Sequence, residues 1–259
     1  MTSGQAAVRR VASSKKLVVR FGRGRLGGTT YLDALAQRAM QAGREVILVD
    51  ADVRNPSLSR LYPAARMPAG GSPEDFAEMM TEVLGELSNH PGPVSVLVDI
   101  GGGQDRALSD FIRDLNLVGF CQESGVQAVA TYMLGPHPDD LAHALSVRDA
   151  GLLDGGSTIL VLSEAVVKRG QTPEAAFAPL RREPAFVAWV EDGALPVPVR
   201  NLACLEKVRG FGLGLGEAMT GKPGEGGKPL GPVERFQIKD WFRGFEARHA
   251  EADALDLLP

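Results

Sequence analysis

A glycine-rich turn follows the first apolar run of the chain, and its residue types suit phosphate binding. The turn consists of Gly22, Arg23, Gly24, Arg25, Leu26, Gly27, Gly28, Thr29 and Thr30. Glycines allow backbone N–H groups to wrap an anion, arginines supply positive charge, and a threonine hydroxyl group can bind Mg²⁺. The turn therefore predicts a binding site for a phosphate group or a nucleotide.

The spacing of the glycines fits two kinds of nucleotide site. Gly22-x-Gly24-x-x-Gly27 after a strand is typical of a Rossmann dinucleotide site, as in an NAD(P)-dependent oxidoreductase, and Asp50 follows near the distance expected for the ribose-binding acid. Gly22-x-x-x-x-Gly27-Gly28-Thr29 is instead a phosphate-binding loop with glycine at its lysine position. In that loop, backbone N–H groups still wrap the phosphates, but the ammonium group that neutralises them is missing. The turn alone leaves both interpretations open.

Acidic residues end the next two predicted strands. Asp50 and Asp52 lie at the end of one apolar run, and Asp99 lies at the end of the following one. Each of these acids could simply cap a helix or end a strand in solvent. A dinucleotide enzyme uses one acid on the ribose, whereas a Mg²⁺–nucleotide site uses several, one near the metal and one near the attacking water. Three acids converging on Thr29 therefore favour the phosphate-binding loop.

Apolar runs of strand length alternate with helical stretches along most of the chain. The predicted strands are residues 16–21, 45–50, 94–99, 126–133, 157–162 and 185–190. The predicted helices are residues 30–42, 73–87, 107–117, 139–150, 172–180 and 202–219, and one more near the C-terminus. Buried strands separated by amphipathic helices predict a doubly wound, mostly parallel α/β sheet with helices on both faces. Ligands of such sheets bind at the carboxyl ends of the strands, where the turn and the acids lie.

The segment from Val46 to Ser59 resembles the second acidic motif of the ParA/MinD superfamily of deviant-Walker ATPases. Its core is Asp50-Ala51-Asp52-Val53-Arg54-Asn55-Pro56. The loop of that family reads Gly-Lys-Gly-Gly-x-Gly-Lys-Thr-Thr, and residues 22–30 align with it without a gap. The resemblance implies a P-loop NTPase fold, nucleotide binding by residues 22–30, ATP and Mg²⁺ as cofactors, and a homodimer that holds ATP between its subunits.

The resemblance also assigns roles to the acidic residues and to the threonine. Asp99 falls on the Mg²⁺-associated acid of the third strand, and Thr29 and Asp50 complete the implied metal site. Asp52 falls on the acid that positions the attacking water, which makes it the implied catalytic residue.

Both lysines of the family loop are replaced in this chain. Arg23 falls on the signature lysine, which reaches the phosphates of the partner subunit, and arginine keeps that charge. Gly28 falls on the ordinary phosphate lysine and carries no charge. The resemblance therefore implies nucleotide binding with weak or absent hydrolysis.

Three functions remain as alternatives at this point. The resemblance implies a cytoplasmic, nucleotide-dependent dimer switch in plasmid partition, stability or conjugative transfer, with DNA or a plasmid-encoded protein as partner. The Tyr62-Pro63 pair and the Asp99-Ile100-Gly101-Gly102-Gly103 strand end are similar to those of ParA-like proteins from such modules. The alternatives are a non-hydrolysing scaffold or regulatory protein on the same fold and the NAD(P)-dependent oxidoreductase.

The composition is that of an ordinary globular protein. Hydrophobic residues make up 44% and charged residues 23% of the 259 residues, which excludes wholesale disorder. Cys121 and Cys204 are too few for a disulfide framework or a zinc cluster, which favours a reducing cytoplasm. The first 32 residues contain seven basic and no acidic residues and so carry a charge of +7. Because the net charge of the chain is −4, the remaining residues carry −11. This asymmetry favours an anionic ligand for the turn.

The composition also divides the chain into four segments. Residues 1–14 form a basic tail, residues 15–220 the predicted nucleotide-binding domain, residues 221–232 a Gly/Pro linker, and residues 233–259 an amphipathic helix with an acidic tail. The helix has an apolar stripe at Ile238, Trp241, Phe242 and Phe245. The acidic residues that follow the stripe are unlike a membrane-binding helix, so docking on the chain's own sheet or on a second subunit is expected and membrane binding is not.

Overall fold

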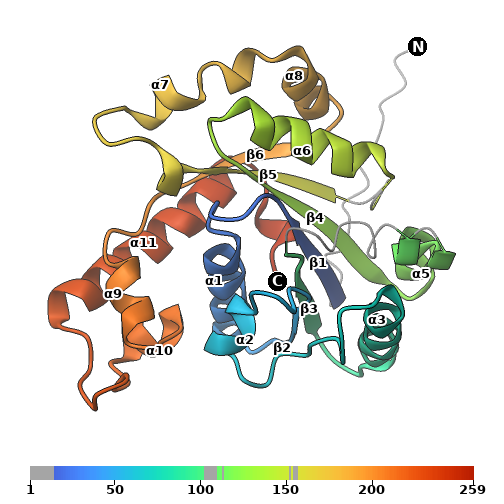
Figure 1. The fold of residues 1–259 in the computed structure, drawn as a ribbon, viewed down its shortest axis with the longest axis horizontal. Coiled ribbons are helices and arrows are strands. Elements are labelled where there is room, and N and C mark those ends of the chain that lie inside the picture. The colour runs from blue at the N-terminus through green and yellow to red at the C-terminus, as the bar shows by residue number, and fades with distance from the viewer. Residues whose placement is uncertain (1–14, 102–109, 113, 152, 154–156) are drawn as a thin grey trace, which may run out of the picture.

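The computed structural model describes residues 15–101, 110–112, 114–151, 153 and 157–259. At its centre is a six-stranded sheet with the strand order β2-β3-β1-β4-β5-β6, and the five neighbouring pairs run parallel. The strands are β1 (Lys15–Phe21), β2 (Glu45–Asp50), β3 (Val94–Asp99), β4 (Val126–Leu134), β5 (Ser157–Ser163) and β6 (Leu195–Val199). The predicted doubly wound α/β sheet is therefore confirmed (Figure 1).

Helices cover both faces of this sheet. They are α1 (Gly28–Gln41), α2 (Ser57–Leu61), α3 (Pro73–Asn89), α5 (Leu117–Glu123), α6 (Pro138–Asp149), α7 (Pro173–Phe177), α8 (Pro184–Glu191), α9 (Leu205–Gly210), α10 (Leu215–Thr220) and α11 (Pro232–Glu251). Side chains of α3, α5, α6 and α8 belong to one buried cluster, and those of α1, α9, α10 and α11 belong to another. The two clusters lie on opposite faces of the sheet, because successive residues of a strand point to opposite sides.

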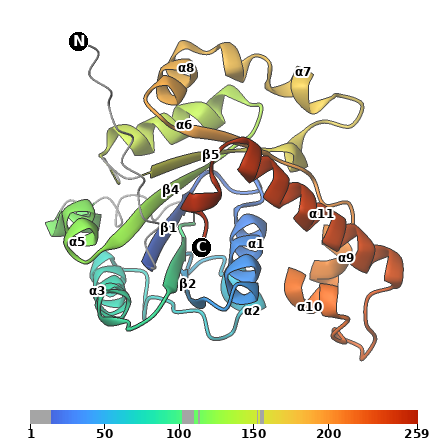
Figure 2. The ribbon, with the colours of Figure 1, turned by 180° about the vertical axis from the view of Figure 1, so that it is seen from behind.

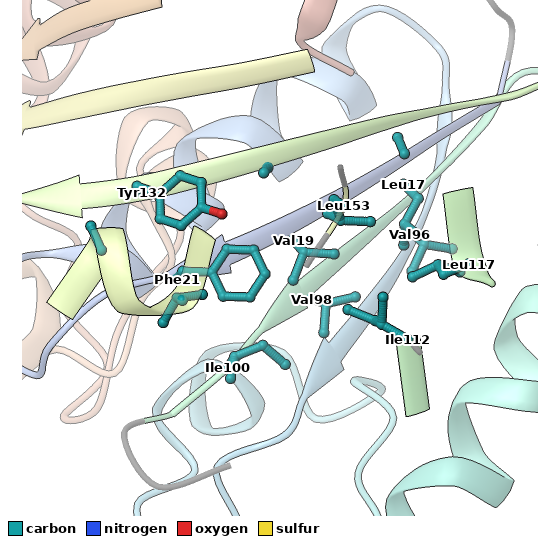
Figure 3. Close-up of a cluster of buried hydrophobic side chains, with 14 of the residues drawn as sticks. Leu17, Val19, Phe21, Val96, Val98, Ile100, Ile112, Leu117, Tyr132 and Leu153 are labelled. Carbon is teal, nitrogen blue, oxygen red and sulfur yellow. The ribbon is translucent and has the colours of Figure 1, made fainter. Parts of the chain in front are cut away.

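The central strand β1 shows how the sequence builds these two cores. Leu17, Val19 and Phe21 point into the first cluster, where Phe21 stacks on Tyr132 of β4 at a ring-centroid distance of 5.1 Å (Figure 3). Val18 points into the second cluster. A strand that is covered on both faces needs apolar residues at successive positions, as the sequence shows.

One predicted strand is wrong. Residues 185–190 form α8, and the sixth strand is β6, which the sequence analysis did not predict. Pro184 occupies the first turn of α8, where its missing N–H costs nothing. Phe186 and Trp189 are buried at helical spacing while Val187 is 39% exposed, so the run has a helical period. The two prolines of β6 are tolerated because this strand lies at the edge of the sheet.

Two predicted helices have different limits in the structure. The helix predicted over residues 202–219 is two short helices, α9 and α10, and Gly212 has a φ of 66° in the turn between them. The helix predicted over residues 107–117 lies partly outside the described residues. Residues 110–112 and 114–115 are helical, and Asn116, with a φ of 51°, separates them from α5.

The last helix docks on the chain itself. Ile238, Trp241 and Phe245 of α11 are buried in the second core cluster, and α11 runs along the same side of the sheet as α1 (Figure 2). This docking is the behaviour expected for the apolar stripe. Beyond α11, the chain returns to the start of β1, where Lys16 donates to the carbonyl oxygens of Asp256 and Leu258, both at 2.6 Å. Across the described residues, no helix combines the length and the apolar character needed to cross a membrane.

Candidate phosphate-binding site

The glycine-rich loop joins the central strand β1 to α1 (Figure 1). Gly22 has a φ of 142°, and a Cβ atom there would lie 2.8 Å from Cβ of Met133 in β4. Gly27 has a φ of 81° at the residue that precedes α1. Because side chains are rarely tolerated at these φ values, both positions require glycine. The loop thus brings the backbone around the end of β1 and directly into the helix.

The N-terminus of α1 is open to an anion. In the part of the chain that the structure describes, no side chain caps this helix, and its first turn contains no acidic residue. The first N–H groups of a helix have no partner within the helix, and they carry the positive end of its dipole. The start of α1 therefore has the properties of an anion-binding site.

Arg25 adopts a backbone conformation that is unfavourable for it. Its φ is 71°, in the left-handed region, which costs a residue other than glycine about 1 kcal/mol. Its side chain is exposed, so its positive charge lies at the rim of the loop. Strain of this kind is concentrated at functional sites.

The side chain of Arg20 fills the space beside Gly28, the first residue of α1. A Cβ atom on Gly28 would lie 2.5 Å from Nε and 2.7 Å from Cζ of Arg20. Nη1 of Arg20 donates to the carbonyl oxygen of Gly22 at 3.2 Å, and Nη2 donates to Asp99. A guanidinium group therefore lies beneath the loop, next to the position at which the family loop carries its lysine.

Arg20 is one of the seven basic residues of the N-terminal segment, and no sequence motif assigns it a role. The signal that could have found it is an arginine directly after an apolar run in a buried strand, because a buried charge needs a partner. That partner is Asp99, which stands opposite Arg20 in the β1–β3 register. Only 9% of the Arg20 side chain and 2% of the Asp99 side chain are exposed, so this ion pair is almost completely shielded from solvent.

Thr29 and Asp99 are brought together as the sequence analysis expected. The hydroxyl group of Thr29 donates to Oδ2 of Asp99 at 2.9 Å. It also lies 2.7 Å from the hydroxyl oxygen of Ser57 in α2, a contact that the sequence analysis missed. Because Thr29 has one hydroxyl proton and gives it to Asp99, Ser57 is the donor in the second hydrogen bond.

Asp50 is next to Asp99 in the β2–β3 register, but its carboxylate serves the chain that follows β2. Its two oxygens accept hydrogen bonds from the backbone N–H groups of Ser59, at 2.8 Å, and Asp52, at 3.2 Å. Burial raises the pKa of Asp50 above its ordinary value, the charge of Asp99 acts in the same direction, and the backbone hydrogen bonds oppose it. Asp50 thus holds the turn in place.

Asp52 lies beside the same strand ends. Its Oδ1 accepts from the backbone N–H groups of Arg54, at 3.2 Å, and Asn55, at 3.0 Å, and so closes a turn of the type aspartate favours. Its side chain occupies the space that a Cβ atom on Gly101 would need. The implied catalytic residue therefore lies against Gly101, two residues beyond Asp99 in the chain, with one oxygen engaged by the backbone.

Arg23 lies at the exposed tip of the loop and pairs within its own chain. Its Nη1 is 3.4 Å from Oδ1 of Asp140 and 3.5 Å from Oδ2 of Asp139, at the start of α6. The resemblance expects this position to reach a second subunit. Within the single chain, the guanidinium group lies against the start of α6.

The side chains expected to bind Mg²⁺ do not fit a metal ion in this arrangement. Asp99 is paired with a guanidinium group, and both oxygens of Asp50 accept backbone hydrogen bonds. Among the described residues, no group of three or more His, Cys, Asp or Glu side chains is placed to hold a metal ion. The start of α1, in contrast, presents uncapped backbone N–H groups of the kind that bind anions.

A small cavity lies on the other side of the loop, at the ends of β5 and β6. It is lined in part by Gly27, Thr30, Ser163, Asn201 and Trp241. Its volume of about 30 Å³ is close to the share of one water molecule in the liquid. A nucleotide base bound here would therefore have to displace side chains around it.

The strand order bears on the oxidoreductase alternative. In a Rossmann fold the second strand lies beside the first, which brings its terminal acid to the ribose of the dinucleotide. Here β3 lies between β1 and β2, so Asp50 is one strand too far from the loop and Asp99 takes the adjacent position. This order argues against the dinucleotide interpretation of the glycines.

The parallel sheet, the glycine-rich loop between β1 and α1, and the contact of Thr29 with Asp99 define an α/β protein with the architecture of a P-loop NTPase. Solved structures with a distant similarity to the chain include the MinD cell division protein of Aquifex aeolicus, with 14% identity and a TM-score of 0.45 over 90% of this chain and 97% of that one. A nucleotide-binding protein from Archaeoglobus fulgidus in complex with ADP has 15% identity and a TM-score of 0.44 over 78% and 87% of the two chains.

Chloroplast FtsY from Physcomitrella patens is 14% identical, with a TM-score of 0.44 over 66% of this chain. The chain spans 56%, 52% and 65% of the length of three FtsY structures that it matches. No protein-family model matches the chain, and neither does any curated protein.

Proposed function

We propose that this protein binds the phosphate groups of a nucleotide such as ATP or ADP in the loop of residues 22–30 and hydrolyses it very slowly or not at all. The observation that carries the proposal is the uncapped start of α1 behind a loop that Gly22 and Gly27 shape. Backbone N–H groups at such a helix start bind phosphate without any particular side chain.

Slow hydrolysis follows from the side chains around the loop. Phosphoryl transfer is accelerated by cations that contact the phosphates where charge develops. Gly28 supplies none, and Arg20, which is held in place by Asp99 and by the carbonyl group of Gly22, cannot follow the charge that develops on the transferred phosphate. Asp52, the implied catalytic acid, is engaged by backbone N–H groups. The arrangement therefore suits binding better than turnover.

The finer role that we propose is a nucleotide-dependent dimer switch of the ParA/MinD kind, in plasmid partition, stability or conjugative transfer. The motif at residues 46–59 and the arginine at the tip of the loop support it. In such a homodimer Arg23 would leave Asp139 and Asp140 for the phosphates bound by the other subunit, and the dimer would then bind DNA or a plasmid-encoded protein. A scaffold of the same fold would dimerise without nucleotide.

Thermal unfolding in the presence of different nucleotides tests the binding proposal. A ligand of the native state raises the apparent stability by RT ln(1 + [L]/Kd). We expect ATP and ADP to raise Tm and NADH and NADPH to leave it unchanged. Arg60, an exposed residue of α2, offers a control variant, Arg60→Ala, that should respond as the wild type does. A shift with NAD(P)H alone would support the oxidoreductase, and no shift with any nucleotide would contradict the proposal.

A further inference from the structure

We propose that Arg20 is the phosphate-neutralising cation of this loop, supplied from β1 in place of the lysine of α1, and that its pairing with Asp99 makes phosphate binding independent of Mg²⁺. The inference rests on the proposed function and specifies how that site is charged. Three observations carry it, and they concern space, hydrogen bonding and the partner of Asp99.

The first observation is that a side chain at position 28 would require the Arg20 side chain to move from its present place. A Cβ atom on Gly28 would come within 3 Å of Nε, Cζ and Cδ of Arg20, at 2.5, 2.7 and 2.8 Å. Real Cβ atoms essentially never approach other atoms so closely, so one of the two side chains has to move. Because Gly28 has no side chain, it leaves room for the guanidinium group of Arg20. The absence of a lysine at position 28 and the presence of a buried arginine at position 20 therefore depend on one another.

The second observation is an unused hydrogen-bond donor. Nη1 and Nη2 of Arg20 are engaged by Gly22 and Asp99, but Nε is buried and has no partner among the described residues. A buried N–H group of a charged side chain without an acceptor is costly and calls for an explanation. Nε lies next to Gly28, where the first N–H groups of α1 also lack side-chain partners. An anionic oxygen at the start of α1 would satisfy both.

The third observation is that Asp99 already has a cation. Its carboxylate accepts from Arg20 and from Thr29, and only 2% of its side chain is exposed. A hydrated Mg²⁺ ion held by Asp99 would have to compete with a fixed guanidinium group at the same carboxylate. Because that group supplies positive charge beside the phosphates without a metal, binding should not require Mg²⁺.

The ligand chemistry that fits is a di- or triphosphate without bound metal. We therefore use ADP, ATP and inorganic pyrophosphate as probes, each titrated calorimetrically with Mg²⁺ and with EDTA. The wild-type protein should bind ADP with the same affinity, within about twofold, in both buffers. Binding of pyrophosphate would show that the phosphates suffice, and binding of ADP alone would show that the nucleoside is also needed.

Four variants separate the roles of the two positions. Hydrogen bonds to charged groups contribute about 1.5–3 kcal/mol, so Arg20→Ala should weaken ADP binding by about 10- to 100-fold. Gly28→Lys should weaken it as well, because the new side chain displaces Arg20. The double variant Arg20→Ala/Gly28→Lys moves the cation to the lysine position and frees Asp99, so it should regain affinity and become dependent on Mg²⁺. Gly85→Ala in α3 is the matched glycine control, because it lies outside the loop and a Cβ atom there meets nothing within 4 Å.

Removing Arg20 leaves Asp99 as an unpaired buried charge, which destabilises a protein by itself. A second variant, Arg20→Met/Asp99→Asn, removes both charges, and circular dichroism identifies the variants that fold. We expect this folded variant to lose affinity as Arg20→Ala does. Wild-type binding that needs Mg²⁺, or unchanged affinity of Arg20→Met/Asp99→Asn, would overturn the inference and leave the proposed function standing. Failure of the wild type to bind any probe in either buffer would overturn both.

Discussion

Nη1 of Arg23 lies 3.4 Å from Oδ1 of Asp140, so the tip of the glycine-rich loop is tied to the N-terminus of α6 in the same chain. About half of the Arg23 side chain, 47%, is exposed. Only 8% of the Asp140 side chain is exposed, whereas Asp139, 3.5 Å from the same nitrogen atom, is 64% exposed. Exposed ion pairs such as Arg23–Asp139 contribute at most about 1 kcal/mol, because water and salt screen them. The contact with Asp139 is therefore weak, and the half-exposed guanidinium group of Arg23 is accessible to a phosphate group, so the loop tip offers a point at which ligand binding and dimer formation can be coupled.

The first prediction concerns this contact and the dimer. ATP should convert the wild-type protein from monomer to dimer, and Arg23→Ala should abolish the conversion. Asp139→Asn weakens the hold on Arg23 and should favour the dimer by about twofold, as expected for one exposed pair. Asp149→Asn, at the other end of α6, breaks a comparable pair with Arg148 and should change nothing. Light scattering coupled to size exclusion measures the mass, and equal masses with and without ATP would contradict the dimer switch.

The second prediction concerns pH. His249 is fully buried in α11, its Nδ1 lies 2.8 Å from the carbonyl oxygen of Phe245, and its Nε2 lies 3.0 Å from the hydroxyl group of Tyr31. Nδ1 therefore carries a proton, and in the neutral imidazole Nε2 accepts from the hydroxyl group of Tyr31. Burial lowers the pKa of His249 to about 4, and the charge of Arg38 acts in the same direction, while the bond to Phe245 opposes it.

The unfolded chain takes up this proton near pH 6.5 and the folded chain only near pH 4. The free energy of unfolding should therefore fall by about 3 kcal/mol as the pH falls through this window. His249→Gln removes the titrating group, so the difference in the free energy of unfolding between the wild type and this variant should shrink as the pH falls below 6.5. Urea denaturation at a series of pH values measures it, and parallel curves for the two proteins would contradict the assignment.

The third prediction concerns a buried carboxylate that ties α1 to later helices. Asp33 is fully buried and accepts from Arg209 at 2.8 Å, from Tyr62 at 2.6 Å and from the backbone N–H group of Leu215. Breaking a buried ion pair from one side typically costs about 3–5 kcal/mol. We expect Asp33→Ala to lower the free energy of unfolding in urea by about 3 kcal/mol, and Glu82→Ala on the exposed face of α3 to change it by less than about 0.5 kcal/mol. If Asp33→Ala lowered the free energy of unfolding by much less than this, water would have to replace the carboxylate as the acceptor of these hydrogen bonds.

The fourth prediction concerns the strained position in the loop. Arg25→Gly relieves an unfavourable φ and should raise stability by about 0.5–1 kcal/mol, after allowance for the greater freedom of glycine in the unfolded chain. Arg25→Ala removes the same charge but keeps the unfavourable φ, so this variant should be no more stable than the wild type. If Arg25 contributes charge at the rim, both variants should bind ADP more weakly than the wild type. Thermal unfolding and calorimetry separate these effects, and wild-type affinity in both variants would show that Arg25 has no part in binding.

The fold could be predicted from the sequence because each strand that is covered on both faces is a continuous apolar run, as in residues 94–99. The same rule failed at residues 185–190, where a short apolar run fits a helix as well as a strand and only the packing of Phe186 and Trp189 decides. The meeting of Thr29 and Asp99 could be predicted, because parallel strands end at one edge of the sheet. The pairing of Arg20 with Asp99 could not, since it depends on which strand lies beside β1, and strand order is a tertiary property.

The hydrogen bonds that Lys16 donates to the carbonyl oxygens of Asp256 and Leu258 have a consequence for biosynthesis. β1 is made first and lies at the middle of the sheet, yet its buried ammonium group finds these partners only in a segment that is synthesised some 240 residues later. Contacts of such long range are closed late, because chain entropy opposes them. During synthesis, Lys16 can therefore acquire these two acceptors only after residues 256–258 have left the ribosome, long after β1 itself has been made.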